Sequence, residues 1–286
     1  MKKSLLVTLA LSLVLVAAGC SKTTENTTEE VATEVEDATE AVEEDAAEAE
    51  DTAEVDAAEA ETEADTENAT AEGVMSYADY VAADVDTEVC VETYVQAKQA
   101  WWEDNGVGQA TFYTQNQDGA FFIYNMPCSQ EDYDKLVPGT KIKVTGFKSE
   151  WSGEVEIVDA TYEIEDTDTF VADAKDVTDL LGKDELIDYQ NQFVSFKGMT
   201  VEAANDAGDA FLYKWDGSGT EGDDLYFNVS LDGNTYTFTV ESYLCDKDSD
   251  VYKAVQNLKV GDVVDMEGFL YWYEGVNPHI TSISVQ

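Results

Sequence analysis

The chain has 286 residues, including 62 acidic residues, 15 basic residues and one histidine, and its formal net charge is −47. All the basic residues are lysines, and arginine is absent. Such a chain repels polyphosphate and lacks the usual bidentate partner of phosphate and guanine, which makes nucleic acid an unlikely partner. No aromatic residue precedes Tyr77, so we expect the folded material to lie after residue 74.

The N-terminus has the pattern of an export signal. Two lysines precede an apolar run, residues 5–18, which is short for a membrane span. The run leads into Val16-Ala17-Ala18-Gly19-Cys20. Small residues before a cysteine resemble the lipobox of bacterial lipoproteins, which implies cleavage before Cys20 and attachment of diacylglycerol to its sulfur. We therefore expect residues 1–20 to be a lipoprotein signal peptide and the mature protein to be extracytoplasmic, anchored to the bacterial cell membrane through lipidated Cys20. The alternative is an uncleaved anchor or a plain signal peptide.

Residues 21–74 are predicted to be a disordered acidic linker. Positions 21–73 contain 21 acidic residues against the single Lys22. Like charges at helical spacing repel one another, and the segment has no aromatic residue around which to collapse. It suits a stalk that holds the folded part away from the membrane; an acidic tail that collects cations or basic partners is the alternative.

Residues 75–165 show period-2 alternation broken by turn signals, which is typical of strands. Five expected strands with a helix between the third and the fourth follow the order of an OB-fold. We expect helices at 76–83 and 129–136, and strands at 88–97, 110–115, 120–125, 141–147 and 154–162.

Residues 166–286 repeat the same plan. Pro138-Gly139-Thr140-Lys141 aligns with Val260-Gly261-Asp262-Val263, and Thr145-Gly146-Phe147 aligns with Glu267-Gly268-Phe269, which indicates a duplication. The predicted fold is mainly all-β, with two tandem OB-fold-like five-stranded barrels and short helices after the acidic linker. We expect helices at 178–188 and 250–258, and strands at 193–201, 210–213 or 225–231, 235–241, 263–270 and 279–285.

Three stretches of the first repeat carry a family resemblance: Gly119–Tyr124, Leu136–Gly146 and Trp151–Ile157. Here the chain resembles the extracellular OB-fold modules of bacterial surface lipoproteins, some of which are accessory domains of secreted nucleases. The motifs are turn and strand patterns without a catalytic signature. The resemblance therefore implies a fold, a surface location and a binding role, and it assigns no active site.

Catalytic and metal-binding motifs are missing from the sequence. It contains no H-E-x-x-H, C-x-x-C, P-loop or G-x-S-x-G motif. His279 has no histidine partner for zinc, and we expect it to be structural. The acidic, glycine-rich loop 216–224 departs from the EF-hand pattern, so a solvated loop is favoured over a calcium site. The acidic residues at 163–168 are expected in a hinge between the domains. We predict no catalytic residue, metal or cofactor.

Three cysteines remain once Cys20 carries lipid, and an odd number excludes complete internal pairing. Cys90 is expected on the first strand and Cys128 at the end of the third, so a disulfide between them is one interpretation. Free or half-buried thiols are the other.

Aromatic residues are the candidate ligand contacts. OB-folds bind ligands on the face of strands two and three, bordered by the loops after strands one and four. Adjacent residues of an extended segment face opposite ways, so at least one of Trp101 and Trp102 should lie near the surface. The rings could also pack the barrel ends and the seam between the domains. The candidates are Trp101, Trp102, Tyr113, Phe122, Tyr124, Trp151, Tyr271, Trp272 and Tyr273, with Tyr213 and Trp215 at similar positions in the second repeat.

These features favour a non-catalytic, lipid-anchored binding module outside the membrane. A cell-wall glycan or an extracellular peptide or protein suits an acidic aromatic surface better than an anionic polymer does. Two alternatives stay open. One is a surface hydrolase, or an accessory subunit of one, that uses a carboxylate pair of raised pKa between the barrels. The other is binding of single-stranded nucleic acid or of cations by the OB-type fold.

Overall fold

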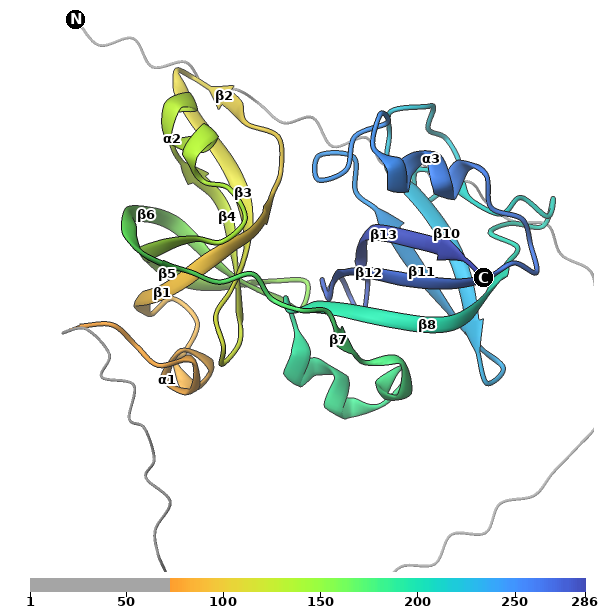
Figure 1. Cartoon of the computed structure of the whole chain (residues 1–286), viewed down its shortest axis with the longest axis horizontal. Coiled ribbons are helices and arrows are strands. Elements are labelled where there is room, and N and C mark those ends of the chain that lie inside the picture. Colours follow the sequence, from red (N-terminus) through yellow and green to blue (C-terminus); the bar gives the residue numbers. More distant parts are fainter. Residues whose placement is uncertain (1–72) are drawn as a thin grey trace, which may run out of the picture. The chain divides into compact units, whose positions relative to one another are not determined.

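The computed structural model describes residues 73–286 (Figure 1). Cys20, the signal peptide and nearly all of the acidic linker lie outside the described residues. The described part contains two β-sheets and three α-helices, and none of these helices has the length and apolar character needed to cross a bilayer.

The first sheet closes into a barrel, here called the first barrel. Its strands follow the order β1-β5-β6-β4-β3-β2, and an additional pairing of β1 with β3 completes the ring. The contact between β4 and β6 is parallel, and helix α2 lies between the third and fourth barrel strands, as in an OB-fold. The elements are α1 (Tyr77–Ala82), β1 (Glu88–Lys98), β2 (Trp102–Asp104), β3 (Val107–Gln115), β4 (Ala120–Pro127), α2 (Gln130–Lys135), β5 (Thr140–Trp151) and β6 (Glu154–Thr169).

The second sheet forms the second barrel on the same plan. Its order is β7-β8-β12-β13-β11-β10-β9, closed by a pairing of β8 with β10, and the β11–β13 contact is parallel. The predicted fold class, two tandem OB-fold-like barrels, is confirmed. The elements are β7 (Lys175–Asp176), η1 (Thr178–Leu180), η2 (Asp184–Tyr189), β8 (Phe193–Glu202), β9 (Leu212–Tyr213), β10 (Leu225–Leu231), β11 (Asn234–Val240), α3 (Asp250–Gln256), β12 (Val263–Phe269) and β13 (His279–Val285).

Local sequence explains where these elements begin and turn. The Ser129 and Ser249 hydroxyls accept hydrogen bonds from the first turns of α2 and α3, which satisfies backbone donors that a helix leaves free. Asp232 and Gly233 join β10 to β11 with φ of 51° and 83°, the left-handed pair of a two-residue hairpin turn. Short polar residues therefore set the boundaries that the period-2 pattern leaves open.

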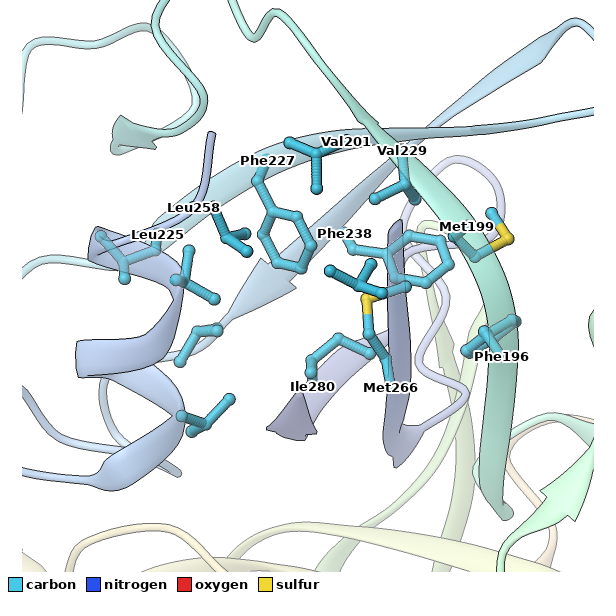
Figure 2. Packing of buried hydrophobic residues seen from close by; sticks show 14 of the residues in the cluster. Phe196, Met199, Val201, Leu225, Phe227, Val229, Phe238, Leu258, Met266 and Ile280 are labelled. Atoms are coloured by element: carbon cyan, nitrogen blue, oxygen red, sulfur yellow. The ribbon is translucent and has the colours of Figure 1, made fainter. Parts of the chain in front are cut away.

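Each barrel has its own apolar core. Figure 2 shows the core of the second barrel, where Phe196, Phe227 and Phe238 lie close to Met266. The Phe196 and Phe238 rings pack edge to face with centroids 4.7 Å apart. Alternate residues of β10 are buried, as the sequence pattern predicts.

A glycine lies at the same position in both barrels because another strand passes close to its backbone. A Cβ on Gly146 of β5 would lie 2.7 Å from the Val158 carbonyl oxygen. A Cβ on Gly268 of β12 would lie only 2.2 Å from the carbonyl oxygen of His279. Both glycines lie at irregularities of register, β5 against β6 and β12 against β13. Only a residue without a side chain fits at these bulges.

The expected helix at 178–188 is two short 3₁₀ helices, η1 and η2. Gly182 separates them with a φ of 76°, a left-handed conformation that interrupts a helix. The prediction of one continuous helix over residues 178–188 is therefore wrong.

The acidic residues expected in a hinge lie instead in strand β6, which continues to Thr169. Glu165 pairs with Lys141 of β5 in the sheet. The Lys141 ammonium is 2.8 Å from a Glu92 carboxylate oxygen and 3.0 Å from one of Glu165, and all three side chains are largely shielded from water. This cation neutralises part of the repulsion that suggested a solvated linker, so the strand extends beyond residue 165.

Candidate ligand-binding groove

The second barrel carries a cavity of about 570 Å³ at the usual OB-fold binding position. Its wall comprises strands β10 and β11, the segment before β10 and the segment between β12 and β13. Trp151, at the end of β5 in the first barrel, completes the wall and packs on Tyr273 with ring centroids 5.1 Å apart. The lining residues are Trp151, Trp215, Asp224, Tyr226, Thr239, Glu241, Tyr271, Tyr273, Glu274, Asn277 and His279.

A second cavity, of about 530 Å³, lies at the corresponding position of the first barrel. It is formed by the connection between β1 and β3 and by strand β4, and two residues that follow β11 of the second barrel close it. The lining residues are Gln99, Ala100, Trp102, Tyr124, Asn125, Glu241 and Tyr243.

Glu241 lines both cavities, so they adjoin; together we call them the aromatic groove. The Glu241 side chain bonds across the two barrels, because its Oε2 accepts from Gln99 Nε2 at 3.1 Å and its Oε1 accepts from the Tyr243 backbone N–H at 3.2 Å. The Ala100 N–H also donates to the Tyr243 carbonyl at 2.8 Å. These contacts fix the segment that joins the two cavities.

The groove is electrically negative. Glu241 is only 8% exposed, and burial, with the nearby Asp224 carboxylate, raises its pKa to about 7. Asp224 Oδ1 accepts from the Ser242 N–H at 2.8 Å and from the Ser242 hydroxyl at 2.7 Å. Among the described residues, neither cavity is lined by a lysine. The groove therefore offers hydroxyl, amide and carboxylate groups between aromatic rings.

His279 forms part of the floor. Its Nδ1 is 2.7 Å from the Tyr113 hydroxyl, and its ring stacks on Tyr271 with centroids 4.2 Å apart. Burial lowers the pKa of His279 to about 3, so the imidazole is neutral at physiological pH. The neutral imidazole contacts Tyr113 and Tyr271 and so holds these side chains together beneath the groove.

Five of the nine predicted ligand contacts line the groove. Four are at least 44% exposed, and Tyr271 is half-buried. They are Trp102, Tyr124, Trp151, Tyr271 and Tyr273.

The structure corrects the prediction for Tyr113 and Phe122. These side chains are only 0% and 3% exposed, so they present no face to a ligand. Both pack with Phe269 of the second barrel in a small apolar cluster, and Phe122 packs edge to face on Tyr271 at 5.4 Å. The second barrel covers this part of the β3–β4 face. Sequence alternation places these rings on one face but does not show what covers it.

The two remaining predicted tryptophans line neither cavity. Trp101 packs against the first core, and its indole N–H donates to the Cys128 carbonyl at 3.0 Å. Its neighbour Trp102 is exposed, which agrees with the prediction that at least one of the two lies near the surface. Trp272 packs against the second core and lies close to Gly153.

Sequence reasoning missed several groove residues. Tyr243 is 68% exposed but comes just after β11, where no pattern marks it. Trp215, which the sequence places at a similar position in the second repeat, is 76% exposed and lines the groove. Asp224 and Glu241 were not singled out as groove residues, because one more carboxylate in so acidic a chain carries no information. Tyr226 was not singled out either, because it belongs to the ordinary alternation of strand β10.

The disulfide interpretation is not realised in the structure, where both Cys90 and Cys128 are free thiols. Val89 and Val91 on either side of Cys90 are buried, so Cys90 points to the outer face of β1. Cys128 belongs to the first core, and burial raises the pKa of its thiol to about 11. The two sulfurs therefore lie on different sides of the barrel wall.

Residues 73–286 contain no cluster of three or more histidine, cysteine or acidic side chains arranged to hold a metal ion. In loop 216–224 the carboxylates bond to their own backbone. Asp216 Oδ1 accepts from the Ser218 N–H at 3.0 Å, and Asp223 Oδ2 accepts from the Thr220 N–H at 2.9 Å. These bonds explain the acidic residues of the loop as turn formers.

The fold and the groove define a tandem OB-fold protein with an acidic groove lined by aromatic residues. No protein-family model and no curated protein matches the sequence. Among solved structures, a p204 HINb domain covers 71% of this chain and 100% of its own, at 11% identity and a TM-score of 0.33. A murine DNA-binding protein bound to double-stranded DNA covers 68% and 94%, at 12% identity and 0.32. A replication protein A heterotrimer bound to single-stranded DNA covers 70% and 48%, at 13% identity and 0.28. At these identities the likeness concerns the fold alone.

Proposed function

We propose that this protein is a non-catalytic glycan-binding module that acts through the aromatic groove. The observation that carries the proposal is a set of exposed rings around two adjoining cavities, at the position where OB-folds bind oligomers. An exposed ring offers a flat apolar surface to the C–H face of a sugar, and burying both surfaces is favourable. The exposed rings are Trp102, Tyr124, Trp151, Trp215, Tyr243 and Tyr273.

Charge favours a glycan over a nucleic acid. Nucleic acids are bound chiefly through lysine and arginine contacts to phosphate. Asp224, Glu241 and Glu274 line the groove, and no lysine joins them among the residues described. Phosphates placed in this groove would face carboxylates without a cation between them.

The polar residues between the rings favour a glycan over an apolar peptide. Gln99, Asn125 and Asn277 present side-chain amides, and Glu274 presents a carboxylate. Amides donate and accept, and carboxylates accept at two oxygens, so both suit the paired hydroxyls of a pyranose. A ring that stacks on one sugar face and a planar polar group at its edge together fix the sugar's orientation.

We further propose that the mature chain is attached to the outer face of the bacterial membrane through lipid on Cys20, with residues 21–74 as spacer. The lipobox-like sequence and the absence of aromatic residues before Tyr77 support this proposal. Detergent phase partitioning tests it. Wild type expressed in a bacterium should enter the detergent phase, and Cys20→Ala should not; equal partitioning would overturn the lipid anchor.

The glycan proposal is tested with the full chain in detergent and with insoluble cell-wall glycan as probe. Trp102→Ala and Trp215→Ala should each weaken binding about tenfold, because removing a central aromatic contact costs about 1.4 kcal/mol or more. Phe147→Ala is the matched control, because this ring is 42% exposed on β5 but lines neither cavity. No binding by wild type, or equal binding by all variants, would overturn the proposal, as would tighter binding of single-stranded DNA at physiological salt.

A second candidate function is glycan hydrolysis, favoured by one observation. Glu241 has a pKa near 7 and lies beside Asp224 in a cavity bounded by both barrels. An acid of raised pKa beside a carboxylate is the pairing that glycosidases use. Both Glu241 oxygens, however, accept hydrogen bonds from the protein itself. New reducing ends that wild type releases from the glycan, and that Glu241→Gln does not, would establish this second function.

A further inference from the structure

Glu241 occupies the junction of the groove. It lines both cavities, so a glycan that spans them passes over this side chain. Its hydrogen-bond donors, the Gln99 amide and the Tyr243 backbone N–H, are both neutral. The carboxylate is thus oriented by the protein without a cationic partner.

We infer that the aromatic groove selects glycans that carry free amino groups, and that Glu241 is the residue that determines this selectivity. The inference rests on the proposed glycan-binding function and names the class of glycan. It goes beyond that function because stacking on rings alone does not distinguish an amino sugar from its N-acetylated or neutral counterpart.

The charge around Glu241 is uncompensated. Asp224 lies close enough to raise the pKa of Glu241, and Glu274 adds a third carboxylate at the rim. His279, the imidazole of the floor, is neutral at physiological pH. A ligand ammonium would supply the missing positive charge in a site partly shielded from water, where a charge pair is screened least.

The aromatic rings of the groove also favour an ammonium group, as the carboxylates do. Tyr243 lines the cavity on one side of Glu241, and Tyr226 and Tyr271 line the cavity on the other. An ammonium is attracted to the face of an aromatic ring, and groups of rings recognise ammonium ligands in many proteins. An N-acetyl group at the same position would add bulk and bring no charge.

The test compares hexamers of equal length made of glucosamine, N-acetylglucosamine and glucose, measured by calorimetry at pH 7 with the full chain in detergent. Wild type should bind the glucosamine hexamer at least about tenfold more tightly than the other two. Glu241→Gln should reduce this preference, measured as the ratio of the affinities for the glucosamine and acetylated hexamers, to about threefold or less. Glu267→Gln is the control, because this carboxylate on β12 is exposed and lies outside the groove.

Additional measurements distinguish failure of this inference from failure of the proposed function. If Glu241→Gln fails to fold, Glu274→Gln on the exposed rim should lower the preference for the glucosamine hexamer, and added salt should lower it in wild type. Equal wild-type affinity for all three hexamers would overturn this inference and leave the proposed function standing. No binding of any hexamer or of cell-wall glycan would overturn both. Tighter binding of a lysine-rich peptide of equal charge would assign the groove to peptides and overturn the glycan class.

Discussion

Replacing Glu154 by glutamine should make the protein more stable at alkaline pH. Glu154 is fully buried at the contact between the barrels, where its Oε2 accepts from the Trp272 backbone N–H at 2.9 Å and from Gln190 Nε2 at 3.3 Å. Its Oε1 has no partner among the described residues. Burial raises the pKa of this carboxyl from 4.5 to about 8, because the ionised form loses its water.

The direction of the pH effect follows from proton binding. Between pH 4.5 and 8 the folded chain holds a proton that the unfolded chain releases. Glu154 therefore costs no stability below this range and lowers stability progressively as pH rises through it. A pKa displaced this far corresponds to a loss of about 3 kcal/mol between pH 5 and pH 8. Glutamine keeps an acceptor for the Trp272 N–H and does not ionise, so Glu154→Gln should recover that amount.

The assay is urea unfolding followed by tryptophan fluorescence at pH 5, 6, 7 and 8. Glu241 and Glu156, whose pKa values are also raised by burial, add to the wild-type slope, so the quantity compared is the difference between variant and wild type. Glu150→Gln, an exposed carboxylate on neighbouring β5, serves as the control and should keep the wild-type slope. If Glu154→Gln also keeps that slope, this account of the contact between the barrels is wrong.

Two other substitutions test the barrels themselves. The Lys148 ammonium donates to the carbonyls of Tyr80, Val81 and Ala83 at 2.7–3.0 Å and so provides hydrogen-bond donors for the carbonyls at the end of α1. Lys148→Met should therefore lower the free energy of unfolding by about 2–3 kcal/mol. Lys143→Met on the same strand should cost much less, and equal losses in urea unfolding would contradict this role. Gly268→Ala should cost about 3 kcal/mol or more, because its Cβ would collide with backbone. Wild-type thermal stability of that variant would refute the close approach of β12 and β13.

The strands and their order follow from local sequence. The alternation in β10, the turn at Asp232-Gly233 and the capping serines Ser129 and Ser249 act over a few residues, so each can be interpreted without the rest of the chain. The period-2 rule also predicted that at least one of Trp101 and Trp102 lies near the surface, and Trp102 does. Mistakes at this level, such as the helix broken at Gly182, are also local.

The site depends on contacts between residues far apart in the sequence. Tyr113 and Tyr124 are both aromatic residues of the first barrel, yet Tyr113 is buried under the second barrel and Tyr124 is 46% exposed in the groove. Glu241 is one of 62 acidic residues, and its role arises because Gln99, 142 residues earlier in the chain, lies beside it.

By itself the sequence determined the tandem OB-fold plan, the acidity of the surface and the number of aromatic residues near the candidate site. The packing of one barrel on the other decided which rings are covered, which carboxylate is buried and where the two cavities meet. The physical reason is that alternation and turn residues report the local path of the backbone. Burial and the pKa of a side chain depend instead on which distant atoms displace its water.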